Sequence, residues 1–149
     1  MNDNKEKLNT FLVKIFNDIL RLEEASLSKD ELGNLSISEI HVIEAVYDSC
    51  QDNTNTMTEI ANKLMVTSST LTTSVKTLEN KGYLVRTKLP SDKRRVNVTL
   101  TPLGEKAYKS HRQFHNDLVN NVTGTLSDEE ISTLALALST LHRYFISIK

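Results

Sequence analysis

The stretch TMTEIANKLMVTSSTLTTSVKTLENKGYLVRTKLPSDKRRVNVTLT, residues 56–101, decides the fold of this 149-residue chain. Thr56 and Thr67 stand where N-cap side chains are needed, ahead of a short helix and a longer one. Gly82 suits the end of the longer helix. Alternating residues on both sides of the polar segment 90–95 then indicate a β-hairpin. A capped helix, a turn, a second helix and a hairpin predict a winged helix-turn-helix.

Helices are expected ahead of this stretch. Residues 6–25 repeat apolar side chains at helical spacing on more than one face, which is more than a single surface helix needs. Ser36 and Glu39 form a capping-box pattern that begins a helix running to about Ser49. Polar residues 50–55 then indicate a loop.

Two further helices are expected after it. Pro102 is tolerated at the first position of a helix that runs towards Val122, and Gly124 is expected to end it. Ser127 and Glu130 repeat the capping box. The last helix then carries a heptad pattern typical of a helix–helix seam: Ile131, Leu134, Leu138, Leu141, Phe145 and Ile148. The fold class is therefore mainly α with a small β-hairpin wing.

The second helix of the central stretch has a face suited to reading DNA. Leu71, Val75 and Leu78 supply its buried side. Its opposite side offers short hydroxyls and one cation: Ser68, Ser69, Thr72, Thr73 and Lys76, with Thr70 near the edge. Within this helix no acidic residue precedes Glu79. Short side chains let a helix enter a major groove about 12 Å wide.

Positive charge is concentrated in the same stretch. Residues 76–95 carry seven basic and two acidic side chains, hence +5, while the whole chain has a net charge of -1. Lys93, Arg94 and Arg95 lie at the predicted hairpin tip, where an arginine is free to enter a minor groove. We expect Asp92 either to pair with Arg94 or to fix the turn. A protein-interaction module, the alternative for a winged helix, would not need this charge.

In the predicted hairpin, Val85, Thr87 and Leu89 are expected on one face, with Arg86 and Lys88 on the other.

Taken in order, these motifs resemble the MarR family of bacterial repressors over nearly the whole chain. The most specific parts are Leu-Glu-Asn-Lys-Gly-Tyr at 78–83 and Asp92-Lys93-Arg94 leading into Leu-Thr-Pro-Leu-Gly at 100–104. The resemblance implies that Asp92 shapes the wing and that Arg94 enters the minor groove, with Arg95 an adjacent possibility.

The resemblance also implies a homodimer on double-stranded DNA that contains an inverted repeat. Residues 1–149 are then one MarR-like domain. Within it, residues 36–101 form the winged helix-turn-helix lobe, and residues 1–35 and 102–149 form dimerisation helices.

Within the family, the chain is most similar to a repressor of fatty-acid-synthesis genes that is helped onto its operator by long-chain acyl groups on acyl carrier protein. The residues that carry this similarity include Ile15-Phe16-Asn17, Glu23-Glu24, the segment 36–41, and Phe114-His115. Ser68-Ser69 depart from the Leu-Gly-like residues expected there, so the operator sequence is expected to differ in detail. The candidate pocket residues, each also compatible with plain core packing, are Phe16, Ile37, His41, Val42 and Phe114.

The sequence also offers candidates for a different effector. His111 and His115 have the i, i+4 spacing of a zinc site that His41 would complete, but Cys50 and the nearest carboxylates have no evident route to that point. A small aromatic or lipophilic ligand is the other alternative. No phosphate-binding loop, paired-carboxylate motif or nucleophile elbow is present, so an enzyme is not expected and no cofactor is assigned.

The chain has no run of roughly 18–20 apolar residues and no signal-peptide pattern at Met1–Asn4. Its single cysteine leaves no partner for an intrachain disulfide and is consistent with a reducing compartment. A cytoplasmic protein without membrane contact is therefore expected.

Overall fold

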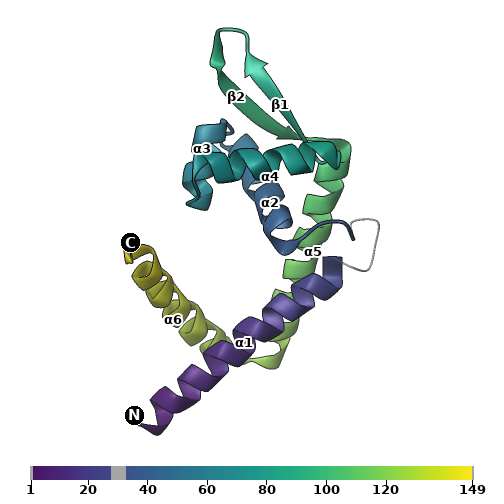
Figure 1. Cartoon of the computed structure of the whole chain (residues 1–149). Helices are drawn as coiled ribbons and strands as arrows, with labels where there is room; N and C mark the ends of the chain where they lie inside the picture. The colour runs from purple at the N-terminus through teal and green to yellow at the C-terminus, as the bar shows by residue number, and fades with distance from the viewer. Residues whose placement is uncertain (1, 28–32, 149) are drawn as a thin grey trace. The chain divides into compact units, whose positions relative to one another are not determined.

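Residues 2–27 and 33–148 are described by the computed structural model of the chain, with Lys93 described by its backbone alone (Figure 1). The described part is mainly helical with one two-stranded hairpin, as the sequence predicts. The elements are, in order, α1 (Asp3–Leu27), α2 (Ile37–Gln51), α3 (Met57–Leu64), α4 (Ser68–Asn80), β1 (Leu84–Leu89), β2 (Asp92–Leu100), α5 (Pro102–Thr125) and α6 (Asp128–Ser147). The chain divides into two compact units, residues 1–112 and 113–149.

The core of the first unit lies among α2, α3, α4 and the hairpin. Ile43 of α2, Ile60 of α3 and Val75 of α4 are fully buried, and Val98 of β2 joins them. Each helix presents one apolar stripe to this core, which is why the three helices pack in spite of their short lengths. The candidate DNA-contacting residues of α4 therefore lie on a well-packed lobe.

Side-chain caps set the starts of the helices, as predicted. Ser36 and Ser127 form complete capping boxes at the starts of α2 and α6. Thr56 and Thr67 accept the N3 amides of α3 and α4. In α3, Glu59 Oε1 accepts a hydrogen bond from the Thr56 hydroxyl at 2.6 Å. Each such cap contributes about 1 kcal/mol.

Two of the predicted helix ends differ from the structure. α2 continues to Gln51, so the loop after it is shorter than the predicted 50–55. α5 runs through Gly124 to Thr125, so Gly124 does not end it. Nothing lies within 4 Å of the position that a Cβ of Gly124 would take. This glycine is therefore the exposed, second-last residue of α5 and not its cap, and the next helix begins after the N-cap Ser127.

The hairpin register contains the feature that shapes the wing. Lys88 pairs with Val96, yet the next residue, Leu89, pairs with Asp92. Residues 93–95 of β2 are therefore extra residues opposite no residue of β1, which makes a bulge at the tip. The sequence predicts a loop over 90–95, whereas the turn is tighter and β2 already begins at Asp92.

The inner face of the hairpin carries Leu84, Arg86 and Val98. Arg86 pairs with Val98, and Leu84 pairs with Leu100, so these side chains share a face. Leu84 and Val98 are buried, whereas Val85 on the other face is 45% exposed. The alternation is as predicted, but the face turned to the lobe is the one that carries an arginine.

The base of the wing is fastened to the loop before α3. Val98 donates its amide to the Asn55 carbonyl at 2.9 Å, and Asn55 Nδ2 donates to the Val98 carbonyl at 2.9 Å. Cys50 Sγ also contacts that carbonyl, and burial raises the pKa of the thiol. Hairpin and helix-turn-helix therefore form one body.

A close backbone approach joins α5 to the end of α4. Thr101 Oγ1 donates to the Gly82 carbonyl at 2.5 Å and accepts the Gly104 amide at 3.1 Å. Gly82 has a φ of 88°, a left-handed conformation that favours glycine at a helix end. A Cβ on Gly104 would lie 2.2 Å from the Tyr83 carbonyl oxygen, so only glycine fits there.

The outer helices expose large apolar side chains. In α1, Leu8, Phe11 and Phe16 are 54–63% exposed. In α6 no residue is buried, and Leu136 and Phe145 are more than half exposed. Among the described helices, none combines the length and apolar character needed to cross a bilayer.

Candidate nucleic-acid interface

Helix α4 presents the predicted two faces. Leu71, Val75 and Leu78 are at most 1% exposed and anchor it in the lobe. The predicted reading side chains Ser68, Ser69, Thr70, Thr73 and Lys76 are exposed, and Thr72 is half-buried. The buried stripe thus orients the helix so that its hydroxyls face solvent.

The hydroxyls of Thr72 and Thr73 on this face already use their protons in hydrogen bonds to the helix backbone. Thr72 Oγ1 donates to the Ser68 carbonyl at 2.8 Å, and Thr73 Oγ1 donates to the Ser69 carbonyl at 3.1 Å. In this conformation each threonine offers a base its oxygen lone pairs and its methyl group. Such a surface accepts hydrogen bonds from adenine N6 or cytosine N4 and contacts thymine methyls. The sequence shows that threonines are present, but not that their hydroxyl protons are already used within the helix.

Among the basic residues in 76–95 whose side chains the structure describes, two form ion pairs within the protein. Arg86 Nε lies 2.6 Å from Glu79 Oε1, and Lys81 Nζ lies 2.8 Å from Glu39 Oε2. These pairs fasten β1 to the end of α4, and α4 to α2. Of the described side chains in this segment, the exposed cations that remain for phosphates are Lys76, Lys88, Arg94 and Arg95.

Glu39 is held in a charged state by its surroundings. Burial alone raises the pKa of this carboxyl, but hydrogen bonds from Lys81 and Ser36 and the charge of Lys81 outweigh it, and the pKa is lowered. Lys81 also donates to the Asn34 carbonyl at 2.6 Å, and the Tyr83 hydroxyl donates to Asn34 Oδ1 at 2.6 Å. This network positions the start of α2 against the end of α4.

Arg94 and Arg95 are exposed on the wing bulge. Asp92 Oδ1 accepts the backbone amide of Arg94 at 3.0 Å, which is the turn-fixing role among the two expected for Asp92. Both arginines line an open pocket of about 280 Å³ whose other wall is the start of α3, Thr56 to Glu59. The side chain of Lys93, the third predicted wing contact, lies outside the described residues.

Of the predicted effector-pocket residues, two line the same described pocket. His41 and Val42 line a pocket of about 240 Å³ together with residues of α3, α4 and the turn between them: Leu64, Val66, Thr70, Leu71 and Ser74. Ile37 lines a different pocket, Phe16 is 63% exposed on α1, and Phe114 belongs to the second unit.

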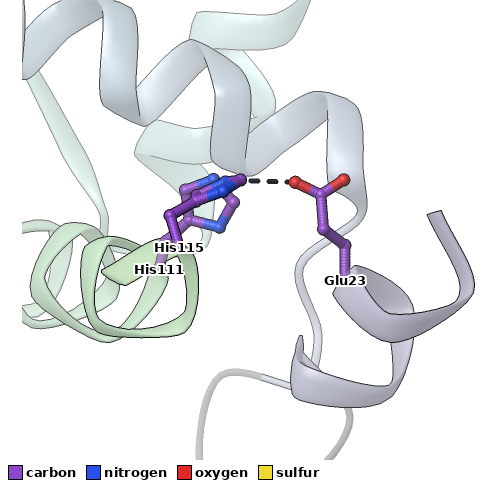
Figure 2. Close-up of side chains that lie close together, drawn as sticks. All are labelled: Glu23, His111 and His115. Carbon is purple, nitrogen blue, oxygen red and sulfur yellow. Dashed lines mark ion pairs between the residues drawn. The ribbon is translucent and has the colours of Figure 1, made fainter. Parts of the chain in front are cut away.

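The expectation that no carboxylate reaches the histidines is wrong. Glu23 Oε1 lies 4.0 Å from His111 Nε2 and 3.7 Å from His41 Nε2. Glu44 Oε2 lies 3.1 Å from His111 Nε2. Glu23 and His111 face one another in Figure 2, with His115 one turn further along α5. Sequence reasoning missed Glu23 because its approach depends on how α1 packs on α2.

Comparisons with known proteins agree with this architecture. Residues 35–96 match the MarR family. The chain is 32% identical to Streptococcus pneumoniae FabT, solved in complex with DNA, over 97% of this chain and 99% of that chain, with a TM-score of 0.90.

Two curated regulators also match in sequence. The chain is 33% identical over 106 residues to the Bacillus subtilis HTH-type transcriptional regulator YhjH, covering 70% of this chain and 57% of that protein. It is 29% identical over 89 residues to Dickeya dadantii PecS, covering 60% of this chain and 54% of that protein. The matched part thus spans just over half the length of these two relatives.

Proposed function

This chain belongs to the MarR family of transcriptional regulators, and on that premise we propose that it is a sequence-specific DNA-binding repressor. The observation that carries the proposal is the pairing of an exposed hydroxyl face on α4 with an arginine-bearing bulge on the wing. α4 enters the major groove, and Arg94 reaches the adjacent minor groove. The full-length likeness to FabT, a protein solved on DNA, supports this assignment.

We propose that it acts as a homodimer on an inverted repeat. The exposed apolar side chains of α1 and α6 support this, because soluble monomers rarely leave such surface in water. In the dimer these helices pair, and two α4 helices meet successive major grooves roughly 34 Å apart. On this proposal residues 1–35 and 102–149 are the dimerisation segments, around the lobe of residues 36–101.

We further propose that long-chain acyl groups on acyl carrier protein act as corepressor and that the regulated genes serve fatty-acid synthesis. The family resemblance of the sequence and the pocket at His41 and Val42 support this. That pocket holds about 240 Å³, below the roughly 300–1,000 Å³ of typical ligand sites, so a long chain needs further surface. The partner protomer supplies it, together with Phe16 of α1.

The corepressor acts by binding the DNA-competent state more tightly. A preference of about 100-fold for that state corresponds to about 2.7 kcal/mol of coupling.

Operator binding tests the proposal. Fluorescence anisotropy with a promoter fragment that contains an inverted repeat, and with the same fragment scrambled, measures sequence specificity. Adding long-chain acyl–acyl carrier protein should tighten binding to the intact repeat, whereas the unacylated carrier should leave it unchanged. Equal affinity for both DNAs would overturn specific repression. Specific binding that ignores the acyl carrier would overturn only the corepressor.

A further inference from the structure

Thr73 lies at the middle of the solvent face of α4. The buried stripe of this helix, Leu71, Val75 and Leu78, is at most 1% exposed, and helical spacing places Thr73 on the opposite side. Its side chain is exposed, whereas that of its neighbour Thr72 is half-buried. Of these two threonines, Thr73 is therefore the one more open to a partner.

The hydroxyl of Thr73 is held by its own helix. Thr73 Oγ1 donates its proton to the Ser69 carbonyl at 3.1 Å. Because the proton is used within the helix, it is not available to a base. The bond also holds the side chain in one staggered rotamer, with the oxygen turned to the preceding turn of the helix. The γ-methyl group leaves the same Cβ in another direction and is the part left free to meet a partner.

The surroundings of Thr73 allow a close approach to DNA. Ser69, one turn before it, and Lys76, almost one turn after it, are both exposed. The first carboxylate within α4 is that of Glu79, and it is paired with Arg86 at 2.6 Å. Short side chains beside Thr73 leave room for a base edge, and the lysine is placed to attract a phosphate.

An outward methyl group selects one base in the major groove. Adenine, guanine and cytosine present hydrogen-bonding groups there, whereas thymine also presents its C5 methyl group. Contact between two methyl groups removes apolar surface from water. Burial of one such group changes affinity by about 4-fold.

We propose that Thr73 is a specificity-determining residue that recognises a thymine in each half of the operator through contact between its γ-methyl group and the thymine C5 methyl. The inference rests on the proposed binding of α4 in the major groove. It adds to that proposal the base that is read and the chemical group that reads it. The Thr73 hydroxyl orients the methyl group and makes no hydrogen bond to a base.

Replacement of thymine by uracil tests the contact. The full-length protein first selects its operator from duplexes of randomised sequence. Fluorescence anisotropy then compares the selected duplex with duplexes in which one thymine at a time, at matching positions of the two half-sites, is replaced by uracil. Uracil keeps every hydrogen-bonding group of thymine and lacks only the C5 methyl. At one pair of matching positions the replacement should weaken binding by about 4-fold for each half-site.

Two variants of Thr73 separate the methyl group from the hydroxyl. Thr73→Ser keeps the hydroxyl and removes the methyl group, so it should bind the thymine duplex more weakly and no longer distinguish it from the uracil duplex. Thr73→Val keeps a methyl group and removes the hydroxyl, so it should retain the distinction. Thr140→Ser is the matched control, because Thr140 is exposed on α6 and its hydroxyl donates to the Leu136 carbonyl at 3.1 Å. It should behave as wild type does.

Three outcomes would overturn the contact. They are uracil replacements that leave affinity unchanged at every position, a folded Thr73→Ser variant that still distinguishes thymine from uracil, and a folded Thr73→Val variant that does not. Circular dichroism of each variant shows whether the fold is retained. Each outcome leaves specific operator binding intact, so the proposed function would stand without the thymine contact. Equal binding of operator and scrambled DNA would instead remove the proposed function itself.

Discussion

Arg86 Nε lies 2.6 Å from Glu79 Oε1, and this pair fastens β1, the first strand of the wing, to the end of α4. The arginine lies on the inner face of the hairpin, opposite the buried Val98, and its side chain is 33% exposed where it reaches Glu79. The pair neutralises a carboxylate in the last turn of α4.

A double-mutant cycle on this pair should give a small coupling energy. Both side chains are about one-third exposed, so solvent screens their attraction, and the coupling in unfolding free energy should be about 0.2–1 kcal/mol. Urea denaturation of Glu79→Gln, Arg86→Gln and the double variant measures it. A coupling above about 2 kcal/mol would mean that the pair is more enclosed than its exposure indicates.

Arg94→Ala should weaken operator affinity by roughly 1–3 kcal/mol, because in the proposed binding mode this exposed side chain on the bulge enters the minor groove. The melting temperature should stay unchanged, since Arg94 is exposed. Fluorescence anisotropy with operator DNA measures the affinity, and Lys7→Ala on α1 is the control. Unaltered affinity in a folded Arg94→Ala variant would remove Arg94 from the interface.

Lys76→Ala should change the salt dependence and not the sequence preference. Lys76 is the exposed cation of α4, and loss of one phosphate contact lowers the slope of log affinity against log salt by about 0.9. Titrations at several salt concentrations, on operator and scrambled DNA, give the slope. A relaxed base preference would instead place Lys76 on a base edge.

Gly104→Ala and Gly124→Ala should change stability in opposite directions. The Cβ added at Gly104 meets the Tyr83 carbonyl oxygen at 2.2 Å, and the resulting displacement should cost about 1–3 kcal/mol or more. At Gly124 the Cβ meets nothing within 4 Å, and alanine should stabilise α5 by up to about 1 kcal/mol. Thermal denaturation of both variants provides the comparison. A neutral Gly104→Ala would refute the close approach.

Acid should weaken the contact between α2 and α4 through Glu39. Its folded-state pKa is lowered, so its contribution to stability is present above the ordinary carboxyl pKa and is lost as pH falls through the lowered value. Lys81→Met removes the cation that binds it, so the variant should be less stable at neutral pH and should lose less in acid. Urea denaturation between about pH 7 and pH 3 measures the difference, with Lys63→Met as control. Parallel curves for wild type and Lys81→Met would exclude Glu39 as the titrating group.

Local chemistry made much of the fold predictable from the sequence. The caps at Ser36, Thr56, Thr67 and Ser127 depend on residues three positions apart, and all four begin helices. The buried stripe of α4 follows from helical spacing alone. Gly124 was wrongly expected to end α5, because a glycine ends a helix only where the chain needs a left-handed residue.

Contacts between elements that are distant in the sequence could not be predicted from local residue patterns. The bulge at 93–95 arises from strand register, and the pairing of Arg86 with Glu79 from the face that β1 turns inward. Likewise, Glu23 and His111 stand 88 positions apart and meet only through the packing of α1 and α5 around α2. The i, i+4 spacing along one helix suggests His111 and His115 as a possible metal-binding pair, but it does not identify Glu23 as their neighbour.

The bulge makes the residues at the tip of the wing independent of the strand register that decides which side chains are buried. Its three additional residues all belong to β2, while the pairs from Leu84 with Leu100 to Lys88 with Val96 keep an uninterrupted register. Residues can therefore be substituted, added or removed at the tip without shifting which side chains enter the core. Relatives built on this lobe can acquire new minor-groove preferences at the wing while the helix-turn-helix beneath it stays unaltered.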